Sequence, residues 1–82
     1  MEIVTVERIR TAISSYLNVE PSKIQSEVSY IVDLGADSLD LVGLIANLEK
    51  ELEIDIPEED YERLTTFGET LSYLEAKLGP VQ

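Results

Sequence analysis

Ser38 is the residue of this sequence whose surroundings are best suited to chemistry. It stands between Asp37 and Leu39, where a polar stretch ends and an apolar, helix-patterned stretch begins. Asp37 and Ser38 are both favourable N-cap residues, and Asp40 would place a carboxylate in the first helical turn. The sequence predicts an exposed serine hydroxyl at the positive end of a helix, where an attached phosphate is tolerated. A plain capping role for Ser38 is the alternative interpretation.

The chain lacks most of the side chains that enzymes use. Its 82 residues include no cysteine and no histidine, so serine–histidine triads, cysteine–histidine dyads and cysteine or histidine metal sites cannot form within it. Asp37 and Asp40 lie at the expected solvent-facing start of a helix, so we interpret them as cap and surface charge. The spacing from Asp33 to Asp40 does not match a calcium-binding loop. We therefore expect no metal site and no catalytic activity.

The negative charge is concentrated in the middle of the chain. Residues 33–62 hold eleven acidic residues against Lys50 alone, a net charge of −10 out of −11 for the whole chain. Such a field repels nucleic acid and anionic membranes and attracts basic protein surfaces. A merely solubilising surface is the alternative. No stretch approaches the ~20 apolar residues of a membrane span, and no signal-peptide pattern begins the chain, so we expect a cytoplasmic protein.

The residues before Ser38 predict one helix and a long loop. Apolar residues recur with a helical period over residues 3–17, and those expected to face the core are Val6, Ile9, Ile13, Tyr16 and Leu17. Residues 18–36 alternate weakly, but no second strand is available to pair with them. We therefore predict a loop that is anchored by apolar side chains, namely Ile24, Val28, Tyr30 and Leu34.

A second helix is predicted over residues 38–53. Its expected buried face consists of Leu41, Leu44, Ile45, Leu48 and Leu52. Leu39, Val42 and Ala46 fall on the opposite side, which makes an apolar outer strip that starts next to Ser38 and suggests a docking surface. Gly43 is expected beside this strip, on the exposed side.

The last third of the sequence predicts a short helix and a longer one. Pro57 permits a short helix through Leu64, and Thr66 with Glu69 predicts a capping box. The core stripe of the last helix is expected to be Phe67, Leu71, Leu74 and Leu78. We predict an all-α fold, a four-helix bundle with a long first loop and a short third helix, as a single domain over residues 1–82.

The run Gly-Ala-Asp-Ser-Leu-Asp at residues 35–40, with the helical pattern to Leu52 and then Glu-Ile-Asp-Ile-Pro at residues 53–57, closely resembles the acyl carrier proteins of dissociated fatty-acid and polyketide synthesis. This resemblance implies 4′-phosphopantetheine on Ser38, attached by a holo-acyl-carrier-protein synthase or another phosphopantetheinyl transferase. It implies that acyl intermediates are carried as thioesters. It also implies partners with basic docking surfaces: acyltransferases, ketosynthases, reductases and dehydratases. We expect a monomer.

The resemblance also assigns roles to individual residues. Recognition by partner enzymes is assigned to Asp37, Leu39, Asp40, Val42 and Ala46. The lining of a pocket for the acyl chain is assigned to Tyr30, Leu44, Leu48, Tyr61 and Leu64. A packed core would use the same five residues.

Some positions depart from the pattern that the resemblance leads us to expect. Fatty-acid carriers usually have glutamate where this chain has Gly43, and acids near the position of Lys50; Tyr30 and Tyr61 also differ from the usual residues. These departures favour a specialised carrier over a housekeeping one. A different class of function, an acidic adaptor or inhibitor that binds non-covalently through the outer strip, explains the charge but not the motif around Ser38.

Overall fold

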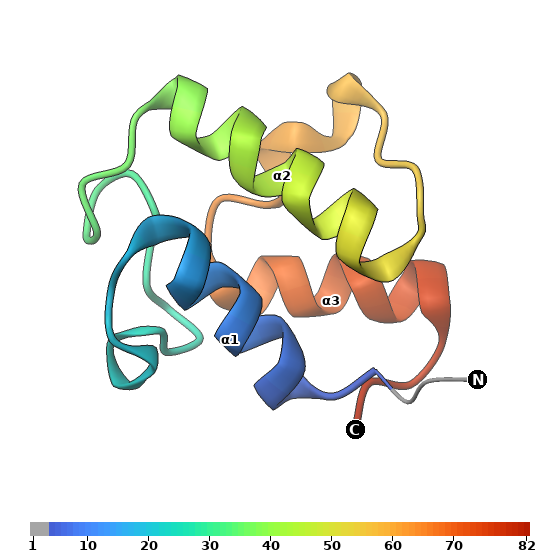
Figure 1. Ribbon diagram of the computed structural model, residues 1–82. Helices are drawn as coiled ribbons and strands as arrows, with labels where there is room; N and C mark the ends of the chain where they lie inside the picture. Colours follow the sequence, from blue (N-terminus) through green and yellow to red (C-terminus); the bar gives the residue numbers. More distant parts are fainter. Residues whose placement is uncertain (1–3) are drawn as a thin grey trace.

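The structure is a computed structural model that describes residues 4–82 (Figure 1). Within these residues the fold consists of three α-helices and two short 3₁₀ helices: α1 (Val6–Leu17), η1 (Pro21–Lys23), α2 (Ser38–Leu52), η2 (Glu58–Arg63) and α3 (Phe67–Leu78). The described residues contain no named strand. The predicted all-α, acyl-carrier-like bundle is confirmed, with a 3₁₀ helix in the place of the short third helix.

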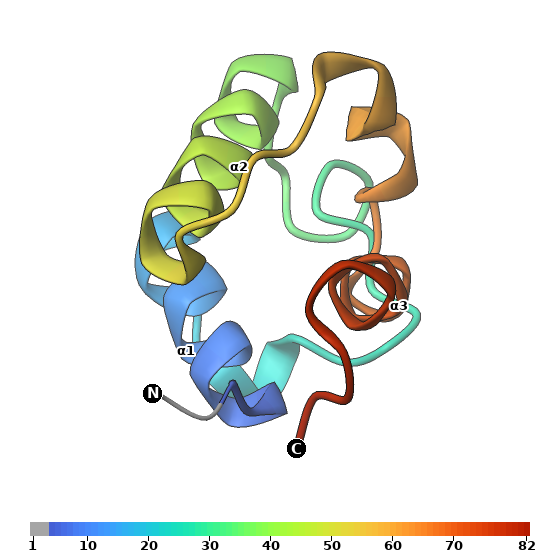
Figure 2. The ribbon, with the colours of Figure 1, turned by 90° about the vertical axis from the view of Figure 1, so that its right-hand side faces the viewer.

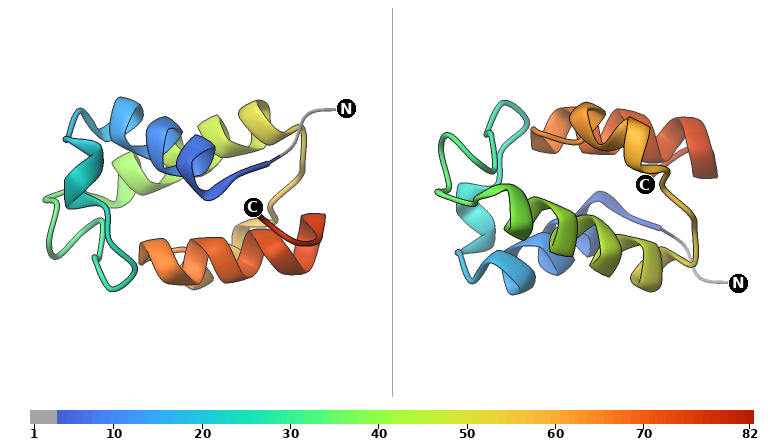
Figure 3. Two further views of the ribbon diagram at one scale, coloured as in Figure 1. Left: turned by 90° about the horizontal axis from the view of Figure 1, so that it is seen from below. Right: turned by 90° about the horizontal axis from the view of Figure 1, so that it is seen from above.

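The elements form two layers. Helices α1 and α2 lie side by side in one layer, and α3 lies with η2 in the other (Figures 2 and 3). The apolar side chains of both layers and of the first loop fill the space between them. The buried hydrophobic residues are Ile9, Ile13, Ile24, Tyr30, Ala36, Leu41, Leu44, Ile45, Leu48, Ile56, Leu64, Phe67, Tyr73 and Leu74.

The helix ends follow local capping rules. Thr5 accepts a hydrogen bond from the Arg8 amide at 3.0 Å and begins α1, and Asn18 ends it in the left-handed conformation. The predicted capping box of Thr66 and Glu69 is present at the start of α3. Each cap satisfies backbone groups that the helix itself leaves open.

The long first loop is anchored more firmly than its sequence predicted. Ile24 and Tyr30 are buried, and Val28 and Leu34 are half-buried, as expected. In addition, the loop runs antiparallel to the start of α3 and pairs with it. The pairing uses three backbone hydrogen bonds: Gly68 N to Ser26 O at 2.8 Å, Phe67 N to Val28 O at 3.2 Å, and Tyr30 N to Thr65 O at 3.0 Å.

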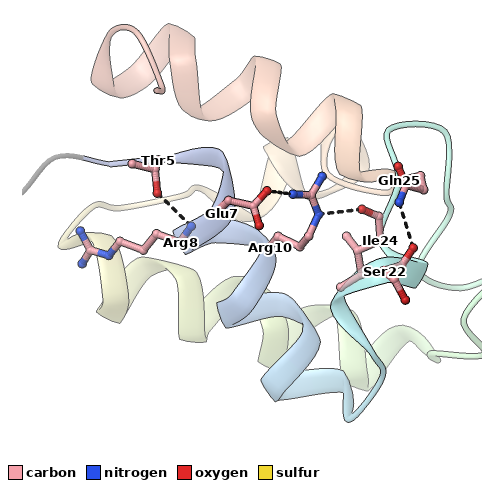
Figure 4. A network of polar contacts seen from close by, with 7 residues as sticks. All are labelled: Thr5, Glu7, Arg8, Arg10, Ser22, Ile24 and Gln25. Carbon is pink, nitrogen blue, oxygen red and sulfur yellow. Dashed lines mark hydrogen bonds and ion pairs between the residues drawn. The ribbon is translucent and has the colours of Figure 1, made fainter.

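Arg10 ties α1 to the loop and to α3. Its Nε donates to the backbone oxygen of Ile24 at 3.0 Å, and its guanidinium also pairs with Glu7 (Figure 4). The same guanidinium stacks over the ring of Phe67, 5.0 Å from the centroid. One side chain therefore fixes three segments that lie far apart in the sequence.

Three predicted placements are wrong. Tyr16 and Leu78, both predicted for the core, are 42% and 37% exposed. Gly43, predicted for the exposed side, is half-buried, because the ring of Tyr16 lies against it. A Cβ added to Gly43 would lie 2.8 Å from Cζ of Tyr16 and closer still to its hydroxyl oxygen. Because Gly43 has no side chain, the Tyr16 ring can pack against α2 at this position.

Candidate functional site

The site begins with the cap of α2. Asp37 is the N-cap residue, and its Oδ1 accepts from the Asp40 amide at 2.8 Å. Asp40 returns the contact, since its Oδ2 accepts from the Asp37 amide at 3.0 Å. The sequence left the cap open between Asp37 and Ser38; the structure assigns it to Asp37.

Ser38 therefore does not act as the N-cap residue of α2. It is the first helical residue, it is exposed, and within residues 4–82 its hydroxyl has no hydrogen-bond partner. The amides of Ser38 and Leu39 lie in the first turn, where an α-helix offers no internal acceptor. An exposed hydroxyl beside open amides at the positive helix end fits a phosphate ester on Ser38.

The segment before the helix sets the direction in which Ser38 is presented. Gly35 has φ +76°, a left-handed conformation that glycine adopts without strain. The next residue, Ala36, is buried, and its amide donates to the Tyr30 oxygen at 2.9 Å. This turn and the buried Ala36 fix the chain immediately before the cap.

The surface around Ser38 is apolar in the middle and acidic at the rim. Leu39 is 80% exposed, Val42 is 44% exposed, and Ala46 is also exposed. Asp37 and Asp40 are exposed on either side of Ser38. The outer strip predicted for α2 is thus open to solvent along the first two turns of the helix.

The five residues assigned to the acyl pocket lie in one hydrophobic cluster. Four of them are 1% exposed, namely Tyr30, Leu44, Leu48 and Leu64, and Tyr61 is partly buried against them. They come from the first loop, α2, η2 and the residue after η2. The cluster therefore joins the first loop, the buried face of α2 and the segment around η2.

A buried polar contact in this cluster was not predicted. The hydroxyl oxygens of Tyr30 and Thr70 are 2.7 Å apart, and Thr70 donates to the backbone oxygen of Thr66 at 2.8 Å. Because the Thr70 proton is used in that way, the Tyr30 hydroxyl is the donor to Thr70. Burial raises the pKa of Tyr30. Thr70 lies one turn after Thr66, a spacing that could have indicated its hydrogen bond to the Thr66 oxygen but not its contact with Tyr30 on the first loop.

A second tyrosine joins η2 to α3. The hydroxyl of Tyr73 donates to Oδ2 of Asp60 at 2.7 Å. Arg63 and Lys77 lie over its ring, 5.1 and 5.6 Å from the centroid. Desolvation, together with the bond to the Asp60 carboxylate, raises the pKa of Tyr73 to about 12. This contact was not predicted from the sequence, because Tyr73 lies outside the predicted stripe of α3.

No group of three or more histidine, cysteine, aspartate or glutamate side chains in residues 4–82 is arranged to hold a metal ion. None of the helices in this part of the chain is both long and apolar enough to cross a membrane.

Comparison with known proteins agrees with this site. Residues 7–74 match the family described as phosphopantetheine attachment site. The chain is 46% identical over 70 residues to an acyl carrier protein of Bdellovibrio bacteriovorus, an alignment that covers 85% of this chain and 90% of that protein. The chain therefore belongs to the acyl carrier protein family, and covalent 4′-phosphopantetheine is its cofactor.

Proposed function

We propose that this chain carries acyl groups on 4′-phosphopantetheine attached to Ser38. It presents them to enzymes of fatty-acid synthesis or of related lipid or polyketide synthesis, and it catalyses no step itself. The observation that carries this proposal is the exposed Ser38 hydroxyl, which is next to the capping box but outside it. The attached group supplies a terminal thiol for thioesters, which a chain without cysteine cannot provide.

The surface of α2 supports docking of basic partner proteins. The acids of residues 33–62 favour long-range attraction to a basic surface, and the outer strip of Leu39, Val42 and Ala46 offers apolar contact area once the proteins meet. We propose that a phosphopantetheinyl transferase, acyltransferases, ketosynthases, reductases and dehydratases bind here, with Asp37 and Asp40 at the rim.

The hydrophobic cluster supports a second part of the proposal. An acyl chain attached near Ser38 would exchange water for apolar surface if it entered between α2 and η2. We propose that Tyr30, Leu44, Leu48, Tyr61 and Leu64 would surround it. Since four of these are packed and buried, entry requires them to move apart.

Intact mass spectrometry tests the attachment. After coexpression with an active phosphopantetheinyl transferase, the wild-type mass should rise by one phosphopantetheine unit, and the mass of Ser38→Ala should not change. Ser15→Ala, which removes an exposed serine of α1, is the control and should be modified like the wild type. Modification at another serine, or none under conditions that load a known carrier, would contradict the proposal and favour a non-covalent adaptor.

A further inference from the structure

Residues 29–34 form a tight turn just before the site. The backbone oxygen of Ser29 accepts from the amides of Asp33 at 3.0 Å and Leu34 at 3.2 Å. The Ser29 hydroxyl accepts from the Val32 amide at 3.1 Å, and the Asp33 carboxylate accepts from the Ser29 amide at 2.8 Å. Backbone and side chains thus close the same turn, which fixes its shape.

This turn presents apolar side chains to solvent. Val32 is 83% exposed, which is the largest exposure among the large hydrophobic residues described, and its neighbour Ile31 is 39% exposed. Neither side chain is needed to close the turn, since the closing contacts use Ser29, Asp33 and backbone groups. An apolar side chain on a turn that is already ordered can bind a partner with little further loss of entropy.

Val32 and Ser38 lie close enough for one partner to cover both. A hydrogen bond of 2.9 Å joins the Ala36 amide to the Tyr30 oxygen. Val32 lies two residues after Tyr30, and Ser38 lies two residues after Ala36. At 3.8 Å per residue this limits their separation to roughly 20 Å. An interface of about 800 Å² per partner is roughly 30 Å across. The loop and the start of α2 also lie at the same end of the molecule (Figures 1 and 3).

The charges around this surface indicate the kind of partner. Residues 28–49 contain four acids, namely Asp33, Asp37, Asp40 and Glu49, and no lysine or arginine. Val32 and Leu39, both at least 80% exposed, therefore have acidic and no basic side chains among the residues near them in the sequence. A complementary surface has an apolar recess bordered by lysine or arginine side chains.

We propose that Val32, supported by Ile31, is a contact for the phosphopantetheinyl transferase that modifies Ser38. This inference rests on the proposed function, because it assumes that Ser38 is the modified residue. The transferase acts before the phosphopantetheine is attached, so its active site must reach the Ser38 oxygen directly. Its surface must therefore contact the end of the molecule that holds Val32. The turn thus adds a second contact segment to the strip on α2.

The test is the steady-state kinetics of loading the apo chain with coenzyme A and a purified phosphopantetheinyl transferase. Val32→Ser should raise KM about five- to thirtyfold, in the range of a significant interface contact, and leave kcat within about twofold. Val32→Leu keeps an apolar contact and should stay near the wild type. Leu78→Ser removes an exposed apolar residue at the C-terminal end of α3 and should leave both constants unchanged.

Each other outcome overturns the inference. An unchanged KM for Val32→Ser, with full loading of the wild type, would overturn the role of Val32 and leave the proposed function intact. If the wild type is never loaded, both fail. Light scattering that shows a wild-type dimer and a Val32→Ser monomer would mean that a second copy of the chain covers the turn.

A loss of stability in Val32→Ser calls for a second variant. If Val32→Ser lowers the urea midpoint, the kinetics are measured on Val32→Thr, which keeps the branched shape. An unchanged KM for Val32→Thr then overturns the inference.

Discussion

Asp37 and Ser38 are adjacent residues with different roles at the start of α2. The carboxylate of Asp37 completes the cap, while the hydroxyl of Ser38 makes no hydrogen bond to a described residue. The residue proposed for modification therefore carries little of the stability of the helix. This separation lets Ser38 gain a bulky group without loss of the cap.

The two alanine variants should differ accordingly. Asp37→Ala should lower the free energy of unfolding by about 0.5–2 kcal/mol, because the Asp40 amide loses its acceptor. Ser38→Ala should cost less than about 0.5 kcal/mol, since alanine is a good helix former and no cap is lost. Urea unfolding measures both, with Asp37→Asn as the control that keeps an acceptor. A larger loss for Ser38→Ala would show that the cap is assigned to the wrong residue.

Gly43 and Tyr16 should be coupled. In an open helix, Gly43→Ala would stabilise by up to about 1 kcal/mol, but here the new Cβ would displace the Tyr16 ring. We expect Gly43→Ala to be more favourable in a Tyr16→Ala background than in the wild type, by at least about 0.5 kcal/mol. Urea unfolding of the four chains in the cycle measures the coupling. If Gly43→Ala changed the free energy of unfolding equally in both backgrounds, the Tyr16 ring could move away from position 43 without a loss of stability.

Two tyrosines should make the free energy of unfolding fall at alkaline pH. Burial raises the pKa of Tyr30, and desolvation with the Asp60 contact raises that of Tyr73 to about 12. In the unfolded chain both ionise near pH 10, so above that pH the unfolded state loses protons that the folded state keeps. The free energy of unfolding should therefore be fully retained below about pH 10 and fall above it.

Phenylalanine variants separate this effect from general alkaline unfolding. At pH 7, Tyr30→Phe should cost about 0.5–1.5 kcal/mol, because the hydrogen bond to Thr70 is lost. Between about pH 10 and 11, Tyr30→Phe with Tyr73→Phe should lose stability less steeply than the wild type, as measured by urea midpoints. An equal slope in both chains would contradict the assignment to these two groups.

At the scale of the elements, the pairing of the first loop with α3 holds the fold together. Gly68 stands at the closest approach: its amide donates to the Ser26 oxygen at 2.8 Å, and an added Cβ would lie 2.9 Å from that oxygen. Because the obstacle is backbone, it cannot rotate away as a side chain could. The loop therefore depends on a residue that lies far from it in the sequence.

Gly68→Ala should push the loop away from α3. We expect a loss of about 1–3 kcal/mol, the usual cost of overpacking a close contact, together with faster hydrogen exchange of the Tyr30 and Phe67 amides. Ser72→Ala, an exposed change on the same helix, is the control and should have little effect. A Gly68→Ala chain as stable as the wild type would show that the loop can shift without cost.

At the scale of the whole molecule, the acidic field opposes folding. Residues 33–62 carry a net charge of −10, and self-repulsion of this kind weakens with ionic strength. Arg8 neutralises part of it through its ion pair with Glu51 at 3.5 Å. Most of these acids are exposed, so added ions can screen them.

The thermal midpoint should therefore rise with added salt and with millimolar divalent cation. Since no metal cluster is found in residues 4–82, Mg²⁺ and Ca²⁺ should act alike, as general screening ions. Calorimetry from low to ~0.5 M NaCl and with each cation measures this. A flat or falling midpoint, or a large preference for one cation, would contradict the idea of unspecific repulsion.

Local patterns were sufficient to predict the main elements. The helical periods and the capping box of Thr66 with Glu69 depend on residues within one or two turns of each other. The buried faces of α1 and α2 were predicted largely correctly for the same reason, as was the open strip at Leu39 and Val42. Ser38 was identified as the candidate site by its neighbours in the sequence alone.

Contacts between distant residues were decided only by the tertiary structure. The position of Tyr16 depends on the missing side chain of Gly43 on another helix, and the loop partner of Gly68 is some forty residues away. The Tyr73–Asp60 contact likewise exists only because η2 folds back on α3. Sequence periodicity describes how one element divides between core and solvent, but the fit of one element on another depends on distances that no local pattern contains.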